Sequence, residues 1–317
     1  MSILEVKNLS AGYNGKRILK DCSFGVEEGE VVVILGASGD GKSTLMKAIA
    51  GLIPHYKGGV YFDNDKIKDS SEQLVPGHPF IKLINQDFQL EDFHTVEENI
   101  RLRLLSYDEN YQKDRIQTLL RLTKLTAYRD QKANDLSGGQ KQRLAIARAL
   151  AAEPDFILLD EPFNQLDFQM KQSISKHILN YIRANRIGAI MVTHSGLEAM
   201  EWADRIVHLS KGRIRRIATS ENFYDDPQSL EEARFFGTVN KVLLDGGKQI
   251  YFRPEGFRLE KDDQHSIELN LTFKRQTKMG WYNIFEFRFQ NRRVILYSTK
   301  DLSEFSKFFV KKLDFSD

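Results

Sequence analysis

Residues 4–7 alternate between apolar and polar side chains, the period of two that is typical of a half-buried strand. Asn14-Gly15 follows, a dipeptide that favours a hairpin turn. Further apolar residues stand at Ile18, Leu19 and Phe24. We therefore expect an antiparallel β layer at the start of the chain.

Apolar runs recur further along the chain, and helical patterns separate them. The runs that predict strands are residues 31–35, 80–84, 156–159, 189–192 and 205–209. Helical spacing predicts a helix after residue 43, with Leu45, Ile49 and Leu52 on its apolar side and a stop near Gly51 and Pro54. It also predicts helical structure from about 95 to 128, with Ile116, Leu119, Leu120 and Leu122 on one face. Further helices are expected from 137 to before Pro154 and from about 167 to 184. Because strands alternate with helices, the sheet should be largely parallel.

The pattern changes after about residue 236, where short alternating runs replace the long helical patterns. These runs are residues 249–252, 267–271, 284–289 and 294–297, with turn residues such as Gly246-Gly247 between them. They predict a small β-rich domain, a partial barrel. We expect an α/β domain over residues 1–235, with a helical subdomain at about 87–150, and a β domain over 236–317.

Composition narrows the function classes without selecting one. The 317 residues are 41% hydrophobic and 28% charged, as in ordinary globular proteins, and the net charge of +2 gives no bulk electrostatic case for binding nucleic acid. The start carries no apolar signal segment, and no apolar run reaches the roughly 20 residues that a membrane span needs. Cys22 is the only cysteine, so no internal disulfide forms and a reducing cytosol fits.

A phosphate-binding loop is predicted between the strand at 31–35 and the helix that follows. Gly36-Ala37-Ser38-Gly39-Asp40-Gly41-Lys42-Ser43 matches the pattern G-x-x-x-x-G-K-[ST]. Backbone N–H groups of such a turn cradle anionic oxygens, and the helix start adds its positive dipole end. Lys42 can then reach the β- and γ-phosphates, while the Ser43 hydroxyl can ligate Mg²⁺. We expect Asp40 to point to solvent, because an acidic side chain near phosphates is unfavourable.

Two carboxylates follow the strand at 156–159. Asp160 can sit beside a metal ion, and Glu161, facing the other way, can approach an attacking water. The competing interpretation is a buried strand followed by a helix-capping acid. His194 follows the strand at 189–192 and could contact a γ-phosphate, although a lone histidine there is more often a loop residue. All these groups follow the carboxyl ends of strands, where ligands bind in open α/β sheets.

The stretch Leu136-Ser137-Gly138-Gly139-Gln140 carries a second signal. Ser137 with Gln140 three residues later is a capping box, so this stretch should open a helix. With the phosphate loop and the Asp160-Glu161 pair, the chain resembles the ATP-binding subunits of ABC transporters over about residues 1–235. The resemblance implies a P-loop NTPase domain with a mostly parallel sheet, an antiparallel β layer and a helical subdomain.

The family's motifs map onto this chain residue by residue. Tyr13 matches the adenine-stacking aromatic, 36–43 the Walker A motif, Gln86 the Q-loop, 136–140 the signature, Asp160 with Glu161 the Walker B pair, Leu166-Asp167 the D-loop and His194 the switch histidine. The implied catalytic residues are Glu161, His194 and Gln86, and the implied metal ligands are Ser43, Gln86 and Asp160. The implied ATP contacts are Tyr13, Gly36, Ala37, Ser38, Gly39, Asp40, Gly41, Lys42, Ser43, Thr44, Ser137, Gly138, Gly139, Gln140 and Asp167. Asn164-Gln165 and Ser195 depart from the residues usual in the family.

The resemblance also implies cofactors and partners. ATP and Mg²⁺ would be held in pairs of sites between two copies of the subunit, each signature serving the ATP on the opposite Walker A. The subunit would sit peripherally on the cytoplasmic face of the membrane, against separate permease subunits and indirectly a solute-binding protein. Residues 250–259 resemble the RPE strand and turn in the C-terminal TOBE domain of importer ATPases for maltose-type sugars, polyamines, ferric iron or molybdate.

Three other classes compete with an importer subunit. An exporter subunit would not be expected to carry a TOBE-like tail. An ABC ATPase of repair or translation usually carries tandem halves or coiled-coil inserts, and this chain has one Walker A motif and no sustained heptads. A regulator that only binds ATP fits poorly with an intact Asp160-Glu161 pair. The residues do not name the transported solute.

Residues 86–93 lie between the nucleotide edge and the helical region. Phe88, Leu90 and Phe93 are apolar in an otherwise polar stretch. They either pack inside the helical subdomain or line a groove that receives a permease helix.

Overall fold

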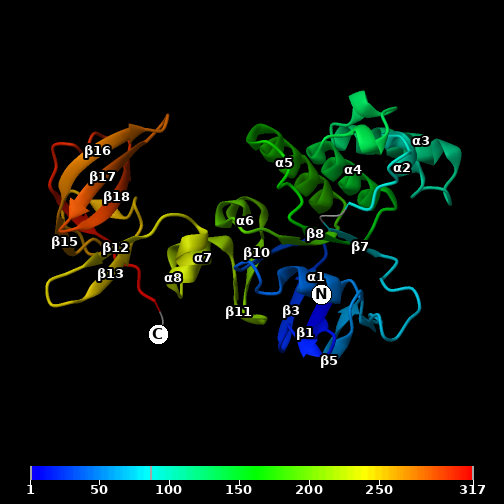
Figure 1. The fold of residues 1–317 in the computed structure, drawn as a ribbon, viewed down its shortest axis with the longest axis horizontal. Helices are drawn as coiled ribbons and strands as arrows, with labels where there is room; N and C mark the ends of the chain where they lie inside the picture. The colour runs from blue at the N-terminus through cyan, green and yellow to red at the C-terminus, as the bar shows by residue number, and fades with distance from the viewer. Residues whose placement is uncertain (1, 86–87, 316–317) are drawn as a thin grey trace. The chain divides into compact units, whose positions relative to one another are not determined.

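The computed structural model describes residues 2–85 and 88–315 (Figure 1). The chain divides into two compact units, Met1–Ser220 and Glu221–Asp317. This division falls earlier than the boundary at 235–236 that the sequence pattern favours, and the domain assignment itself stays a prediction.

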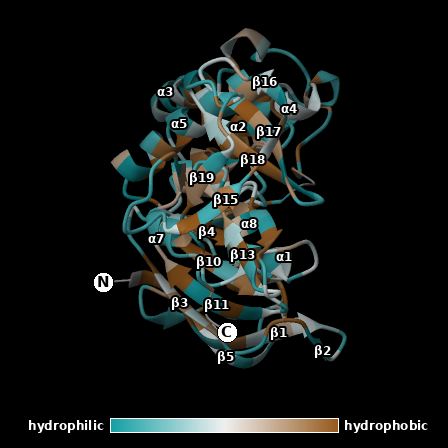
Figure 2. Cartoon of the chain, turned by 90° about the vertical axis from the view of Figure 1, so that its left-hand side faces the viewer, coloured by the Kyte–Doolittle hydropathy of each residue, from teal (hydrophilic) through white to brown (hydrophobic). Residues whose placement is uncertain are grey.

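A six-stranded sheet forms the centre of the first unit. Its strands, in spatial order, are β11 (Arg213–Ala218), β10 (Arg205–Ser210), β4 (Val31–Leu35), β9 (Gly188–Val192), β8 (Phe156–Asp160) and β7 (Ile81–Ile84). Every neighbouring pair is parallel except β10 with β11, which confirms the largely parallel sheet. Strands β4, β8 and β9 are buried along their whole length, as continuous apolar runs require. The edge strand β11 instead alternates, and Figure 2 shows its ribbon changing between hydrophilic and hydrophobic colours.

An antiparallel layer forms the second sheet of this unit, as predicted. It contains β1 (Ser2–Tyr13), β2 (Lys16–Arg17), β3 (Cys22–Glu27), β5 (His55–Phe62) and β6 (Asp65–Lys66). The β1–β2 hairpin turns at Asn14 and Gly15, whose φ angles of 49° and 75° suit the tight turn that this dipeptide predicts. Ile18 and Leu19 lie outside the strands, contrary to expectation, because both of their N–H groups donate to the Ala11 carbonyl instead of joining a ladder.

The helices of the first unit follow the predicted order, with one further helix at 196–202 that was not predicted. They are α1 (Lys42–Ile49), α2 (Val96–Arg101), α3 (Glu109–Leu122), α4 (Gly138–Ala151), α5 (Phe168–Ala184) and α6 (Gly196–Trp202), with short 3-10 turns at Thr126–Tyr128 and Ala133–Asp135. Helix α1 ends at Ile49 and Gly51 takes a left-handed φ of 71°, as expected from the predicted stop near Gly51. Leu52, expected on the apolar side of this helix, lies beyond its end and is 37% exposed. The helical pattern at 95–128 corresponds to the two helices α2 and α3 and the first of these 3-10 turns. Ile116, Leu119 and Leu120 form the buried face of α3.

The second unit is rich in β structure, as expected. After α7 (Ser220–Asp225) and α8 (Leu230–Phe235) it contains β12 (Asn240–Leu243), β13 (Gln249–Phe252), β14 (Phe257–Arg258), β15 (Ile267–Asn270), β16 (Thr272–Lys278), β17 (Asn283–Phe289), β18 (Arg292–Ser298) and β19 (Lys307–Val310). Their hydrogen bonds form sheets of two, three and three strands around one apolar core.

The Arg253-Pro254-Glu255 turn has a structural role within this unit. The buried Arg253 guanidinium lies 4.0 Å from the ring centre of Tyr224 and donates to the carbonyl oxygens of Tyr224 and Ala233 at 3.0 and 3.3 Å. The Tyr224 hydroxyl donates to the Glu255 carboxylate. The turn therefore fastens the end of β13 to the segment that carries α7 and α8.

Candidate functional site

The predicted phosphate loop connects the buried strand β4 to helix α1. Its glycines are required by conformation and by space. Gly39 and Gly41 have φ angles of 87° and 101°, in the left-handed region that favours glycine. A Cβ on Gly36 would lie 2.3 Å from the Leu209 carbonyl oxygen of the neighbouring strand. The loop therefore adopts a turn whose backbone only this glycine pattern permits.

Lys42 stands at the first position of α1 and folds back over this loop. Its ammonium donates to the carbonyl oxygens of Gly36 and Ala37 at 2.9 and 2.8 Å, and the side chain is buried. The cation is thus held inside the loop, where an incoming phosphate can accept the same hydrogen bonds.

Asp40 does not point to solvent, and this corrects the sequence-based expectation. One carboxylate oxygen accepts the Ala37 N–H at 2.7 Å, and the other accepts the Lys211 N–H at 2.8 Å. The Asp40 carbonyl also accepts the Gly212 N–H at 3.0 Å. The expectation failed because it weighed only repulsion from phosphate. Each carboxylate oxygen instead accepts a backbone N–H group, and these two hydrogen bonds hold the phosphate loop against the β10–β11 turn.

Asp160 is the last residue of β8, and its carboxylate lies beside the phosphate loop. Burial raises its pKa, whereas a hydrogen bond with the Ser43 hydroxyl and the nearby Lys42 ammonium act in the opposite direction. The side chain of Ser43 therefore meets that of Asp160, as the motif spacing predicts. Asp160 stands at the end of β8, whereas Ser43 stands in the first turn of α1, which follows β4 and the phosphate loop.

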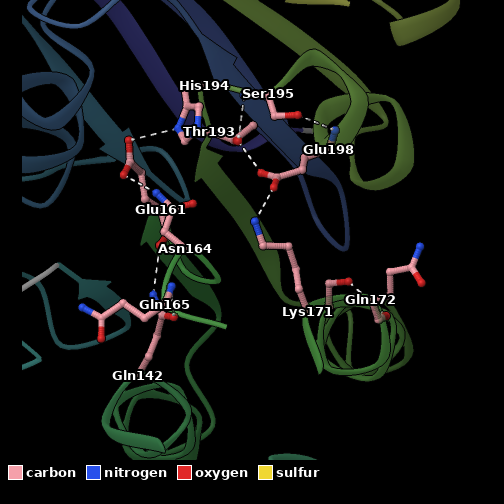
Figure 3. Close-up of polar contacts among 11 residues, drawn as sticks. Gln142, Glu161, Asn164, Gln165, Lys171, Gln172, Thr193, His194, Ser195 and Glu198 are labelled. Atoms are coloured by element: carbon pink, nitrogen blue, oxygen red, sulfur yellow. Dashed lines mark hydrogen bonds and ion pairs between the residues drawn. The ribbon is translucent and has the colours of Figure 1, made fainter. Parts of the chain in front are cut away.

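Glu161 follows directly and occupies a strained backbone position, with a φ of 53° that is unusual for a residue with a side chain. One carboxylate oxygen lies 3.7 Å from Nδ1 of His194, and the other accepts a hydrogen bond from the Asn164 amide (Figure 3). His194 is 66% exposed at its side chain, so its imidazole is open to a ligand. The structure thus brings Glu161 and His194 together at the carboxyl edge of β8 and β9.

Ser195, which departs from the family pattern, has a local structural role. Its hydroxyl accepts the Glu198 N–H at 3.3 Å and so caps α6. The Glu198 carboxylate accepts hydrogen bonds from Thr193 and Lys171, which joins α6 to the residue that follows β9 and to α5, beside His194 (Figure 3).

The signature stretch opens α4 as predicted. Ser137 is the N-cap, its hydroxyl accepts the Gln140 N–H, and the Gln140 side chain accepts the Ser137 N–H, which completes a capping box. Gly138 and Gly139 leave room for residues 165–166. A Cβ on Gly138 would lie 2.2 Å from the side-chain oxygen of Gln165, and a Cβ on Gly139 would lie 2.9 Å from the backbone oxygen of Gln165. Sequence reasoning did not predict this close approach.

A cleft of about 320 Å³ lies between the start of α4 and the start of α5. It is lined by Ser137, Gly138, Gly139, Gln140, Arg143, Gln165, Leu166, Asp167 and Met170. Asp167 caps α5 by accepting the Met170 N–H at 2.9 Å. The structure therefore groups the signature with the D-loop, and groups the phosphate loop with Asp160, Glu161 and His194.

Gln142 connects these two groups and has no signal in the sequence. Its amide donates to the Glu161 carbonyl at 3.0 Å and accepts the Gln165 N–H at 3.2 Å (Figure 3). These contacts join residues about twenty positions apart, so no local pattern could have revealed them.

The remaining predicted residues lie as follows. Tyr13 ends β1 with 38% of its surface exposed, and Thr44 lies half-buried in the first turn of α1. Ala37 and Ser38 are exposed on the phosphate loop. Gln86 lies outside the described residues.

Comparison with known proteins decides the family. The ABC transporter family model matches residues 19–164. A spermidine/putrescine import ATP-binding protein, PotA of Bacillus cereus, is 36% identical over 264 residues, covering 83% of this chain and 79% of that protein. The chain belongs to the ABC transporter ATPases.

Other relatives agree with this assignment. An Fe(3+) ions import ATP-binding protein, FbpC of Haemophilus influenzae, is 33% identical over 292 residues, covering 84% of this chain and 83% of that protein. A dimeric ATP-binding cassette in a post-hydrolysis state, bound to ADP and phosphate, is 30% identical with a TM-score of 0.60, covering 68% of this chain and 98% of that one.

The chain is therefore an importer-type ABC ATPase, which binds and hydrolyses ATP to power solute uptake. Over residues 2–85 and 88–315, the structure contains no helix of the length and apolarity that a bilayer crossing demands.

Proposed function

We propose that the phosphate loop, Asp160, Glu161 and His194 form one ATP hydrolysis site at the carboxyl edge of the parallel sheet. Lys42 binds the phosphates, Glu161 positions the attacking water, and His194 contacts the γ-phosphate. The observation that carries this proposal is the 3.7 Å approach of Glu161 to His194 beside a phosphate loop that already holds the Lys42 ammonium. Tyr13 stacks on the adenine, in line with its exposed position at the end of β1.

The residues present fit a magnesium ion in the same site. The Ser43 hydroxyl and the Asp160 carboxylate are hydrogen-bonded to each other and offer the oxygen ligands that Mg²⁺ prefers. Among the described residues no cluster of three or more acidic, histidine or cysteine side chains could hold a metal alone. This suits Mg²⁺, which commonly takes one or two protein ligands and completes its shell with phosphates and water. Gln86 is proposed as a further ligand. When bound, the ion neutralises charge on the phosphates.

We further propose that two copies of the chain share two ATP molecules. The cleft beside Ser137 is lined by residues of α4 and the 165–170 segment, away from the phosphate loop of the same chain, so the signature can serve an ATP on another subunit. A capped helix start offers N–H groups and a positive dipole end to a γ-phosphate.

Mixing of variants tests this arrangement. Ser137→Arg and Lys42→Ala each damage both sites of a homodimer, whereas a mixed dimer keeps one intact composite site. We expect the mixture to hydrolyse ATP faster than either variant alone. Equal, low rates before and after mixing would contradict the shared site.

A permease subunit is the proposed second partner. A groove of about 400 Å³ lies between β7, the segment that follows it, α2 and α4, and Phe88 contributes to its lining. The remaining lining comes from Lys82, Leu83, Ile84, Asn85, Gln89, Leu102, Arg103, Ala145, Arg148, Ala149 and Ala152. The lining combines apolar side chains with the cationic Lys82, Arg103 and Arg148, a mixture that suits the insertion of a short amphipathic helix. Phe88 is half-buried here, and Phe93 is 80% exposed, so neither is a core residue of the helical subdomain.

Phe88→Ala tests this groove. We expect the isolated subunit to keep its ATPase activity and its melting temperature, while co-purification with the permease weakens. Anchors of this kind commonly contribute at least about 2 kcal/mol. Phe305→Ala, at an exposed phenylalanine of the second unit, is a matched control. Unchanged co-purification of the Phe88 variant would remove this residue from the interface.

The proposed location follows from these partners: the cytoplasmic face of the membrane, with an extracytoplasmic solute-binding protein engaged only through the permease.

We also propose that the second unit is a TOBE-like domain that folds separately. A chain that ends at Ser220 should still bind ATP with similar affinity, and complete loss of binding in a folded truncation would argue against separate domains.

A further inference from the structure

Asn164 lies in the turn that follows β8, at a position where the sequence departs from its family. Its backbone N–H approaches the Glu161 carbonyl at 3.4 Å, which closes the turn. Its side-chain amide donates to Oε2 of the Glu161 carboxylate. Figure 3 shows the two side chains facing each other beside His194. The contact needs a side chain with an N–H or O–H donor at position 164, and an alanine has none.

The backbone of Glu161 is already fixed from two sides. Its N–H donates to the Val192 carbonyl at 3.2 Å, and its carbonyl accepts the Gln142 amide at 3.0 Å. These bonds do not fix the orientation of the side chain, because a glutamate side chain has several rotamers and ordering it costs conformational entropy. The Asn164 amide acts on this side-chain orientation.

The orientation of the Glu161 carboxylate decides which of its oxygens faces His194. With Oε2 bound to Asn164, Oε1 lies 3.7 Å from Nδ1 of His194. The Glu161 side chain is 25% exposed, whereas Asn164 is exposed, so the contact lies at the solvent edge of the site. A hydrogen bond to a charged carboxylate is stronger than one between neutral groups.

We propose that Asn164 is a positioning residue for hydrolysis, which holds the Glu161 carboxylate turned toward His194 without itself contacting ATP. The proposal rests on the water-positioning role of Glu161. Because Asn164 orients the Glu161 carboxylate before water and the γ-phosphate meet, the carboxylate does not have to be oriented during the reaction.

Steady-state kinetics of Asn164→Ala give the first test. We expect kcat to fall about tenfold with KM for ATP within twofold of the wild type, because the contact orients a catalytic group and leaves binding unaltered. Asn164→Asp has nearly the same shape but places a second carboxylate beside Glu161, so it should lose more than tenfold and serves if the alanine variant does not fold. Asn185→Ala removes an exposed amide at the other end of α5 and should leave kcat unchanged.

A double-mutant cycle separates positioning from a general structural effect. In a Glu161→Gln background, single-turnover hydrolysis should be the same with and without the Asn164→Ala substitution, since the group that Asn164 orients is gone. An equal tenfold loss in both backgrounds would overturn the proposal, as would a kcat of Asn164→Ala within twofold of wild type. Wild-type rates in Glu161→Gln alone would instead refute the role of Glu161, so the two failures are distinguishable.

Discussion

Replacing Asp40 by alanine should weaken ATP binding, because Asp40 stabilises the conformation of the phosphate loop. Its carboxylate accepts two backbone N–H groups, Ala37 at 2.7 Å and Lys211 at 2.8 Å, and so holds the phosphate loop against the β10–β11 turn. Hydrogen bonds to charged groups contribute about 1.5–3 kcal/mol each when shielded. Asp40 is only half-buried, so we take about 0.5–1 kcal/mol for each, or about 1–2 kcal/mol together.

If that energy orders the loop for binding, its loss raises the Kd for ATP by about five- to thirtyfold. Asp40→Asn keeps one acceptor oxygen and should lose about half of this free energy. The assay is an equilibrium titration with a fluorescent ATP analogue, with Asp263→Ala as a control at an exposed carboxylate of the second unit. A Kd of Asp40→Ala within twofold of wild type, in a protein with an unchanged melting curve, would refute this reasoning.

Three further outcomes follow from the structure. Gly139→Ala should lower the melting temperature, because its Cβ would lie 2.9 Å from the Gln165 backbone oxygen and overpacking costs about 1–3 kcal/mol; an unchanged melt would show that the D-loop can move away. Burial raises the pKa of Asp160, so the stability of the nucleotide-free protein falls as pH rises from near 3.8 through the folded-state pKa. Asp160→Asn should therefore have a higher melting temperature than the wild type at pH 7, while losing hydrolysis. A lower melting temperature would contradict the direction of this effect. Arg253→Ala should destabilise the second unit, since it removes the stacked partner of Tyr224, and leave ATP affinity unaltered, which calorimetry and titration can check together.

The sequence was sufficient for the features that depend on local chemistry. The strand at 31–35, the glycine pattern of the phosphate loop and the Ser137–Gln140 capping box each need only neighbouring residues, and the structure contains all of them. The parallel order of the sheet followed from alternating strands and helices. The meeting of Ser43 with Asp160 followed from the rule that strand ends share one edge.

The features that were missed depend on long-range contacts or on competition between forces. Gln142 joins Glu161 to Gln165 only after α4 has packed beside the sheet. Asp40 was expected in solvent because repulsion from phosphate was weighed without its backbone donors. In both cases the residue's tertiary neighbours decided its role.

The water-positioning role of Glu161 is the central claim of the proposed mechanism, and one variant tests it most directly. Glu161→Gln keeps the size of the side chain and removes its charge. The account predicts that this variant binds ATP as tightly as the wild type and hydrolyses it about 10²–10⁴-fold more slowly. Hydrolysis within threefold of wild type, in a pure preparation with unaltered ATP affinity, would contradict it.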